Sequence, residues 1–116
     1  MLDRLFAGGS LSTLEGMLTY ASARQQLIAA NIANVDTVGY RTRDLGQPDF
    51  RGALDRALRP GPAADAGPLK PNGNNVDLEI EMAKMVRNSA LHSTAASLLA
   101  QQFALLREAI AGHVIS

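Results

Sequence analysis

The sequence predicts an all-α protein with two long terminal helices that pack as a coiled coil and are joined by an irregular connector. Near each end, key positions recur alternately three and four residues apart, and most of them are apolar. That spacing is typical of a helix that packs lengthwise against other helices. All five prolines lie between the two patterned segments, where they exclude a continuous helix. The 116 residues are expected to form a single unit.

The first helix is expected at about residues 10–34. Ser12 and Glu15 have the spacing of a capping box, in which each side chain bonds a free backbone N–H of the first turn. Asn34, Asp36 and Gly39 are residue types that end helices and form turns. The stripe along this helix consists of Leu14, Leu18, Ala21, Gln25, Ile28, Ile32 and Val35.

The connector is expected at about residues 35–75. Residues 40–44 are predicted to be extended and exposed. A short amphipathic helix is predicted at about 49–58, bracketed by Pro48 and Pro60. Residues 59–75 are rich in Pro, Gly and Asn, which disfavour both a helix and a central strand.

The second helix is expected at about residues 76–111. Glu79 and Glu81 fall in its first turn, where they complement the helix dipole, and Gly112 is the expected stop. Its stripe consists of Leu78, Met82, Met85, Ser89, His92, Ala96, Leu99, Phe103, Leu106 and Ile110. A flanking stripe consists of Leu91, Ala95, Leu98, Leu105 and Ala109. Together they make an apolar face wide enough for more than one neighbouring helix.

Two helices with one seam each give a lone molecule little net stability. Ordering a residue costs about 1.5 kcal/mol, whereas burying a large aliphatic side chain returns about 1.5–3 kcal/mol. We therefore expect the chain to order fully only as copies assemble. The residues predicted to form the assembly interface are Leu14, Leu18, Ile28, Ile32, Leu78, Met82, Met85, Leu99, Phe103, Leu106 and Ile110.

Composition argues against several classes of partner. Eleven basic residues balance eleven acidic ones and form no basic tract, so nucleic-acid binding is not expected. The chain lacks the apolar run of about 18 residues that direct membrane insertion requires. The first residues contain Asp3 and too short an apolar run for a signal peptide. Without cysteine, the chain has neither disulfides nor thiol chemistry.

No catalytic, cofactor-binding or metal site is predicted, and the chain is not expected to be an enzyme. His92 and His113 have no neighbouring His or Cys with which to hold a metal. Glu79 and Glu81 point to different sides of a helix. Gln25, Ser89 and His92 interrupt the apolar stripes, either because they specify register between helices or because they are simply exposed.

The end of the first helix and the turn after it resemble a signature of the bacterial flagellar axial proteins. The matching residues are Asn31, Asn34, Thr37, Gly39, Tyr40 and Arg41. The family usually has Pro before the glycine, where this chain has Val38; Gly39 keeps the conformationally permissive position.

Residues 74–82 and 103–110 resemble the proximal rod members of the flagellar basal-body rod protein family. The resemblance implies a structural subunit that self-assembles through its terminal helices into a helical tube and transmits torque. It implies no cofactor. The implied partners are other copies, other flagellar rod proteins, the ring-to-rod adaptor with the basal-body ring, and the flagellar export apparatus. The implied location is the rod in the periplasmic space, reached without a cleaved signal peptide. The alternatives are another rod or hook-type axial subunit and a cytoplasmic coiled-coil adaptor or chaperone of the secretion system.

Overall fold

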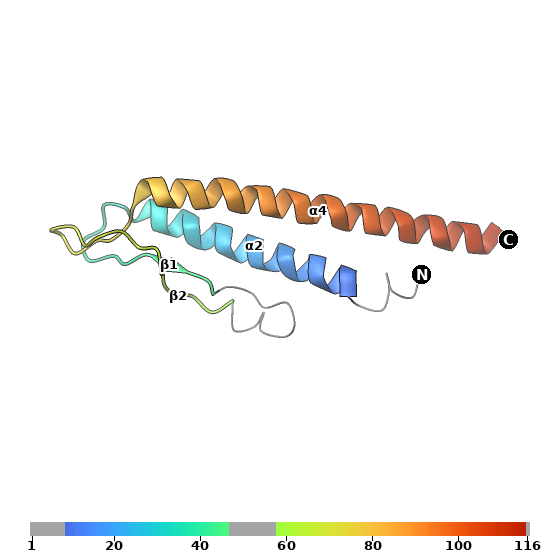
Figure 1. Cartoon of the computed structure of the whole chain (residues 1–116), viewed down its shortest axis with the longest axis horizontal. Coiled ribbons are helices and arrows are strands. Elements are labelled where there is room, and N and C mark those ends of the chain that lie inside the picture. Colours follow the sequence, from blue (N-terminus) through green and yellow to red (C-terminus); the bar gives the residue numbers. More distant parts are fainter. Residues whose placement is uncertain (1–8, 47–57, 116) are drawn as a thin grey trace.

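The structure is a computed structural model that describes residues 9–46 and 58–115. The molecule is elongated, with extents of 70 × 23 × 14 Å. The elements in chain order are α2 (Gly9–Ala33), β1 (Arg43–Asp44), β2 (Gly61–Pro62) and α4 (Leu78–Ile115). In Figure 1 the two helices lie side by side, and the connector folds back beneath α2. The prediction of an all-α fold built on two long helices is confirmed. The short helix predicted at 49–58 lies almost wholly outside the described residues.

Helix α2 packs on α4 through residues that repeat every seven positions. Leu14, Ala21 and Ile28 are all buried and share one face of the helix. Gly16 is buried as well, as expected for a small residue where a neighbour approaches closely. The chain turns after α2, and Gly39 adopts a φ of 74° that favours glycine.

The connector contains a minimal antiparallel pair of strands. Arg43 is paired with Pro62 and Asp44 with Gly61. Proline is tolerated at Pro62 because both strands of a two-stranded sheet are edge strands. No further strand requires the N–H that proline lacks. Residues 40–44 are extended around β1, but the prediction that they are exposed was wrong for Thr42, which is 1% exposed. The pair shields Thr42, whose carbonyl accepts the Ala63 N–H at 3.1 Å.

Helix α4 starts at a capping aspartate. Asp77 Oδ1 accepts the N–H groups of Glu79 at 3.0 Å and Ile80 at 3.3 Å. The helix continues for 38 residues, which corresponds to about 57 Å at the standard rise. Gly112 lies within it and is not the stop that the sequence suggested. A single glycine costs a helix only about 1 kcal/mol.

The face of α4 that contacts α2 is offset from the predicted stripe by one residue. Its buried positions are Glu81, Lys84, Asn88 and Ala95. The neighbouring stripe positions Leu78 and Met82 are exposed instead. Polar residues are tolerated at this seam because α2 and the connector supply partners for them.

A small apolar cluster joins the connector to α2. Tyr20 and Leu45 form its buried centre, and Ala23, Leu27 and Leu58 pack against them. Within the part of the chain that the structure describes, neither helix combines the length and hydrophobicity needed to cross a membrane.

Candidate assembly interface and the polar junction beside it

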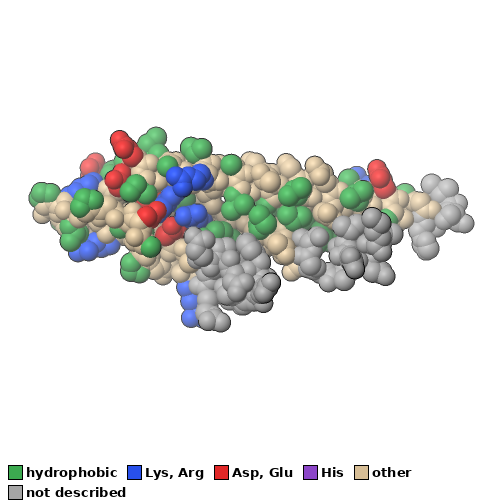
Figure 2. All heavy atoms as spheres, in the orientation of Figure 1, with side chains coloured by type: hydrophobic (Ala, Val, Ile, Leu, Met, Phe, Trp, Pro, Cys, Tyr) green, Lys and Arg blue, Asp and Glu red, His purple; other side chains and the backbone are tan. Residues whose placement is uncertain are grey.

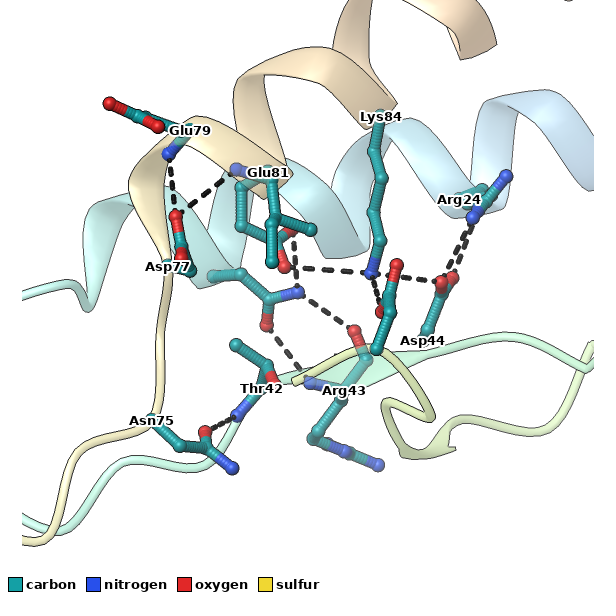
Figure 3. A network of polar contacts seen from close by, with 12 residues as sticks. Arg24, Thr42, Arg43, Asp44, Asn75, Asp77, Glu79, Glu81 and Lys84 are labelled. Atoms are coloured by element: carbon teal, nitrogen blue, oxygen red, sulfur yellow. Dashed lines mark hydrogen bonds and ion pairs between the residues drawn. The ribbon is translucent and has the colours of Figure 1, made fainter. Parts of the chain in front are cut away.

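A buried group of polar residues joins both helices to the connector. It contains Arg24 and Asn31 of α2, Asp44 of β1, and Glu81 and Lys84 of α4, and we call it the polar junction. Figure 3 shows Lys84 and Arg24 approaching Asp44 from two different helices. The junction lies where α4 begins and α2 ends, so it fixes how the chain enters and leaves the helix pair.

Asn31 is completely buried and uses both ends of its amide. Its Nδ2 donates to the Arg43 carbonyl at 2.8 Å and to Glu81 Oε2 at 3.2 Å. Its Oδ1 accepts from the Tyr40 hydroxyl at 2.8 Å and from the Arg43 N–H at 3.2 Å. One side chain thereby connects α2, the connector and α4. The first asparagine of the predicted motif is therefore a structural residue.

Two further asparagines tie the turn after α2 to the segment before α4. Asn74 Nδ2 donates to the carbonyls of Asn34 at 2.9 Å and Thr37 at 2.7 Å. Asn75 Oδ1 accepts the Thr42 N–H at 2.6 Å. The two segments singled out in the sequence thus bond directly to each other.

The remaining motif residues serve the turn itself. Thr37 Oγ1 donates to Asn34 Oδ1 at 3.0 Å, and the Gly39 N–H donates to the Asn72 carbonyl at 2.9 Å. A Cβ added to Gly73 would lie 3.4 Å from the Gly39 Cα, so the backbones approach closely here. Val38 and Arg41 are exposed, which explains why valine is tolerated before the glycine.

The charged side chains of the junction form a chain of ion pairs. Arg24 binds Asp44 through two parallel hydrogen bonds, each 2.9 Å long. Lys84 Nζ lies 3.2 Å from Asp44 Oδ2, 2.6 Å from Asp65 Oδ1 and 3.6 Å from Glu81 Oε1. Lys84 is 5% exposed, so its charge depends on these carboxylates for compensation.

The environment shifts the pKa of both partners toward the charged forms. Burial alone would raise the pKa of Asp44, but Arg24, the Leu45 N–H and Lys84 together hold it below its ordinary value. Burial alone would lower the pKa of Lys84, but hydrogen bonding and Coulombic attraction to Asp65, Asp44 and Glu81 raise it. Asp44 and Lys84 are therefore ionised at neutral pH.

The three polar residues that interrupt the predicted stripes meet in one shallow groove between the helices. Gln25 Nε2 lies 3.4 Å from Ser89 Oγ, and His92 lines the same groove. Gln25 Oε1 also accepts a 2.8 Å hydrogen bond from Asn88, which donates to the Ala21 carbonyl at 2.7 Å. Gln25 and Ser89 thus contact each other across the helix pair, as residues that specify register would.

Large apolar side chains stay exposed along the whole of α4. On one side of the helix lie Leu78, Met82, Val86, Phe103 and Ile110, which we call the open apolar face. Leu98 and Leu105 are exposed on the opposite flank of α4. Val86 is 71% exposed and the other six side chains are 42–58% exposed. Figure 2 shows hydrophobic side chains spread along the helices, while most visible charges gather over the connector half. Several large apolar side chains exposed on one side of a helix favour an interaction site there.

The structure divides the predicted interface residues into three groups. Leu14 and Ile28 are buried within the helix pair. Half-buried positions are Leu18, Ile32, Met85, Leu99 and Leu106. Exposed positions are Leu78, Met82, Phe103 and Ile110. Val86 is not among the predicted interface residues, although it is exposed and follows Met82 at the four-residue spacing of a helix face.

The described residues contain no group of three or more His, Cys, Asp or Glu side chains suited to a metal ion.

Comparison with known proteins identifies the kind of chain this is. The profile of a family described as "Flagella basal body rod protein" matches residues 11–41, which cover most of α2 and the turn after it. The flagellar basal body rod protein FlgB of Aeromonas hydrophila is 28% identical over 119 aligned positions, covering 83% of this chain and 88% of that protein. The chain belongs to the flagellar basal body rod protein family.

Other relatives support the same assignment for this rod protein. FlgB of Yersinia ruckeri is 31% identical over 86 positions, covering 74% of this chain and 53% of that protein. FlgB of Bacillus subtilis is 25% identical over 125 positions, covering 90% of this chain and 95% of that protein. These relatives confirm the prediction of a structural subunit of the basal-body rod, with rod proteins of the FlgB type as its counterparts.

The shifted pKa of Asp44 predicts that acid loosens the junction of this rod protein. The folded-state pKa lies below the unfolded one, so this stabilisation is present above the unfolded value of about 4 and is lost as pH falls through the folded value. We expect the free energy of unfolding to fall steeply below about pH 4. Chemical denaturation between pH 6 and pH 3 measures this.

The variant Asp44→Asn should be less stable than the wild type at pH 6 and should show a flatter decline in acid. Asp36→Asn removes a carboxylate that is exposed in the turn and is the matched control. An equally steep decline in Asp44→Asn and the wild type would contradict the assignment to Asp44.

Proposed function

We propose that this rod protein is a non-enzymatic subunit of the proximal flagellar rod that self-assembles through the open apolar face of α4. The observation that carries the proposal is the exposure of Leu78, Met82, Val86, Phe103 and Ile110 along one long helix. Removing such side chains from water is the main driving force of protein association. The part of the chain that the structure describes offers no comparable catalytic arrangement.

The geometry of the open apolar face suits contacts with more than one neighbour. Leu78, Met82 and Val86 are four residues apart and form a strip near the junction. Phe103 and Ile110 are seven apart and lie farther along α4. If this face meets a different surface on each neighbour, the contacts are heterologous, and they generate an open helical array when the rotation does not close a ring. Many such contacts in parallel would carry torque along a tube.

Membership of the family supports a proposal for further partners and for the location. Under the proposal the subunit contacts other flagellar rod proteins, the ring-to-rod adaptor and the basal-body ring, and it passes through the flagellar export apparatus. It resides in the rod within the periplasmic space and arrives without a cleaved signal peptide. The net charge of zero supports close packing of copies, because they repel one another little.

Thiol labelling tests the proposal cleanly because the chain has no cysteine of its own. We expect Met82→Cys and Phe103→Cys to react readily with a maleimide in the free chain and much more slowly in isolated basal bodies. Asp36→Cys, at the exposed turn, is the matched control for reagent access.

Equal reactivity of Met82→Cys in the free and assembled states would show that this part of α4 is not in the interface. Recovery of the protein only from the cytoplasm, and never in basal bodies, would instead support an adaptor or chaperone.

A further inference from the structure

The connector approaches the helix pair through two separate arms. The first arm is residues 40–46 and contains β1, and the second arm is residues 58–66 and contains β2. Asp44 belongs to the first arm and Asp65 to the second, and both contact the same ammonium group of Lys84. A single cation on α4 therefore binds both arms.

The two arms are held unequally. The first arm is also secured by Arg24 on Asp44, by Asn31 on Arg43 and by Asn75 on Thr42. The second arm has the two-residue β1–β2 pairing, the Ala63 N–H bond to the Thr42 carbonyl and the apolar contact of Leu58. Its only ion pair to the helices within the described residues is Lys84–Asp65, whose nitrogen and oxygen are 2.6 Å apart.

Packing beneath the second arm is loose. A hollow of about 560 Å³ is lined by Arg24, Asp44 and Leu45 on one side and by Arg59, Pro62 and Asp65 of the second arm on another. Apart from Leu58, the arm carries only small or polar side chains and prolines among its described residues. Dispersion contacts are weak across such a space. The attachment of the second arm therefore depends more strongly on the Lys84–Asp65 ion pair.

We propose that the Lys84–Asp65 ion pair is a latch that holds the second arm closed over α2. When the latch opens, residues 58–66 swing away, while Arg24, Asn31 and Asn75 keep the first arm in place. Opening frees the edge of β1 that pairs with β2, and it uncovers Ala23 and Leu27 of α2, which line one hollow with Leu58 and Pro60 of the second arm.

The charges around Lys84 explain why this pair is the one that opens. Asp44 shares its charge with Arg24 of α2, and Glu81 is buried and bonded by Asn31. Asp65 is 54% exposed on its side chain and is bound by Lys84 alone among the described residues. Water can replace Lys84 as the partner of Asp65 at little cost, whereas it has no access to Glu81.

Amide hydrogen exchange of the purified full chain, followed by NMR, tests the latch. The reporter is the Ala63 N–H, which is bonded to the Thr42 carbonyl only while the second arm is closed. We expect Asp65→Asn to speed its exchange about twofold to fivefold, as for a partly exposed ion pair. Lys84→Met should speed it by on the order of a hundredfold, because it also leaves the buried Glu81 carboxylate without a cation.

Three comparisons keep the test decisive. Arg87→Met removes an exposed cation three residues after Lys84 on α4. It should leave the exchange rate of the Ala63 N–H unchanged. Asp65→Asn should add nothing in a Lys84→Met background, since the pair is already broken. The Arg43 N–H, which Asn31 accepts, should stay protected in Asp65→Asn.

Unchanged exchange at Ala63 in Asp65→Asn would overturn the latch. So would an Asp65→Asn effect that is as large without Lys84 as with it. If Lys84→Met unfolds the whole chain, Asp65→Asn still decides, because it leaves the sequences of α2 and α4 intact. The readout is independent of rod assembly, so the latch and the proposed function can fail separately.

Discussion

Replacing Asn31 with alanine is expected to lower the free energy of unfolding by about 2–4 kcal/mol, the largest effect of any single change among the six motif residues. The substitution removes all four hydrogen bonds of the buried amide. Glu81 Oε2 then faces the helix pair without its donor, and the Arg43 backbone loses partners for both its N–H and its carbonyl. Domains are typically stable by only about 5–15 kcal/mol, so the loss is a large fraction of the total.

Thermal and chemical unfolding of the purified chain, followed by circular dichroism, measures this loss. Asn34→Ala is the matched control, because Asn34 bonds mainly to its own turn, through the Ala30 carbonyl and the Thr37 hydroxyl. It should cost about 1 kcal/mol or less. If Asn34→Ala proves as damaging as Asn31→Ala, the polar junction does not depend on Asn31 as the structure indicates.

Replacing Met82 with aspartate is expected to abolish swimming while leaving the helix pair folded. Met82 is 54% exposed, so the isolated chain tolerates a charge there. In an assembled rod the same carboxylate would be buried against a neighbour without a partner, at a cost of several kcal/mol per contact. Because each subunit repeats the contact, the penalty recurs throughout the structure.

Swimming in soft agar and the yield of basal bodies measure the effect, and circular dichroism confirms that the variant chain is folded. Ser97→Asp introduces the same charge at an exposed polar position of α4 and is the control. Ile28→Asp is a different case, because Ile28 is 1% exposed within the helix pair and the change should unfold the chain itself. Normal swimming of Met82→Asp would show that this part of α4 is not an interface.

The two helices, and their ends next to the connector, were predictable from local chemistry. Asp77 caps α4 because a short carboxylate before a helix can bond its first N–H groups, and this depends only on neighbouring residues. Gly39 adopts a positive φ for a similarly local reason. The importance of Asn31 was recognised through its resemblance to a family signature, although its partners could not be derived from spacing alone.

The orientation of α4 was not predictable in the same way. Apolar spacing pointed to Leu78 and Met82 as a seam, yet the residues that face α2 and the connector include Glu81, Lys84 and Asn88. Charged residues are normally exposed, and their burial here depends on Asp44, Asp65 and Asn31, which lie far away in the sequence. A rule based on spacing detects apolar residues but cannot find polar partners that the fold brings together.

The unequal lengths of the two helices give the molecule a direction. α4 has 38 residues and α2 has 25, so among the described residues α4 extends alone past the start of α2. One end carries the polar junction, and the other is the C-terminal part of α4, which extends beyond the described part of α2 (Figure 1). Copies stacked in a row would all have the same orientation along the row. A filament built from them has two chemically different tips, so it can lengthen from one tip while the other stays anchored.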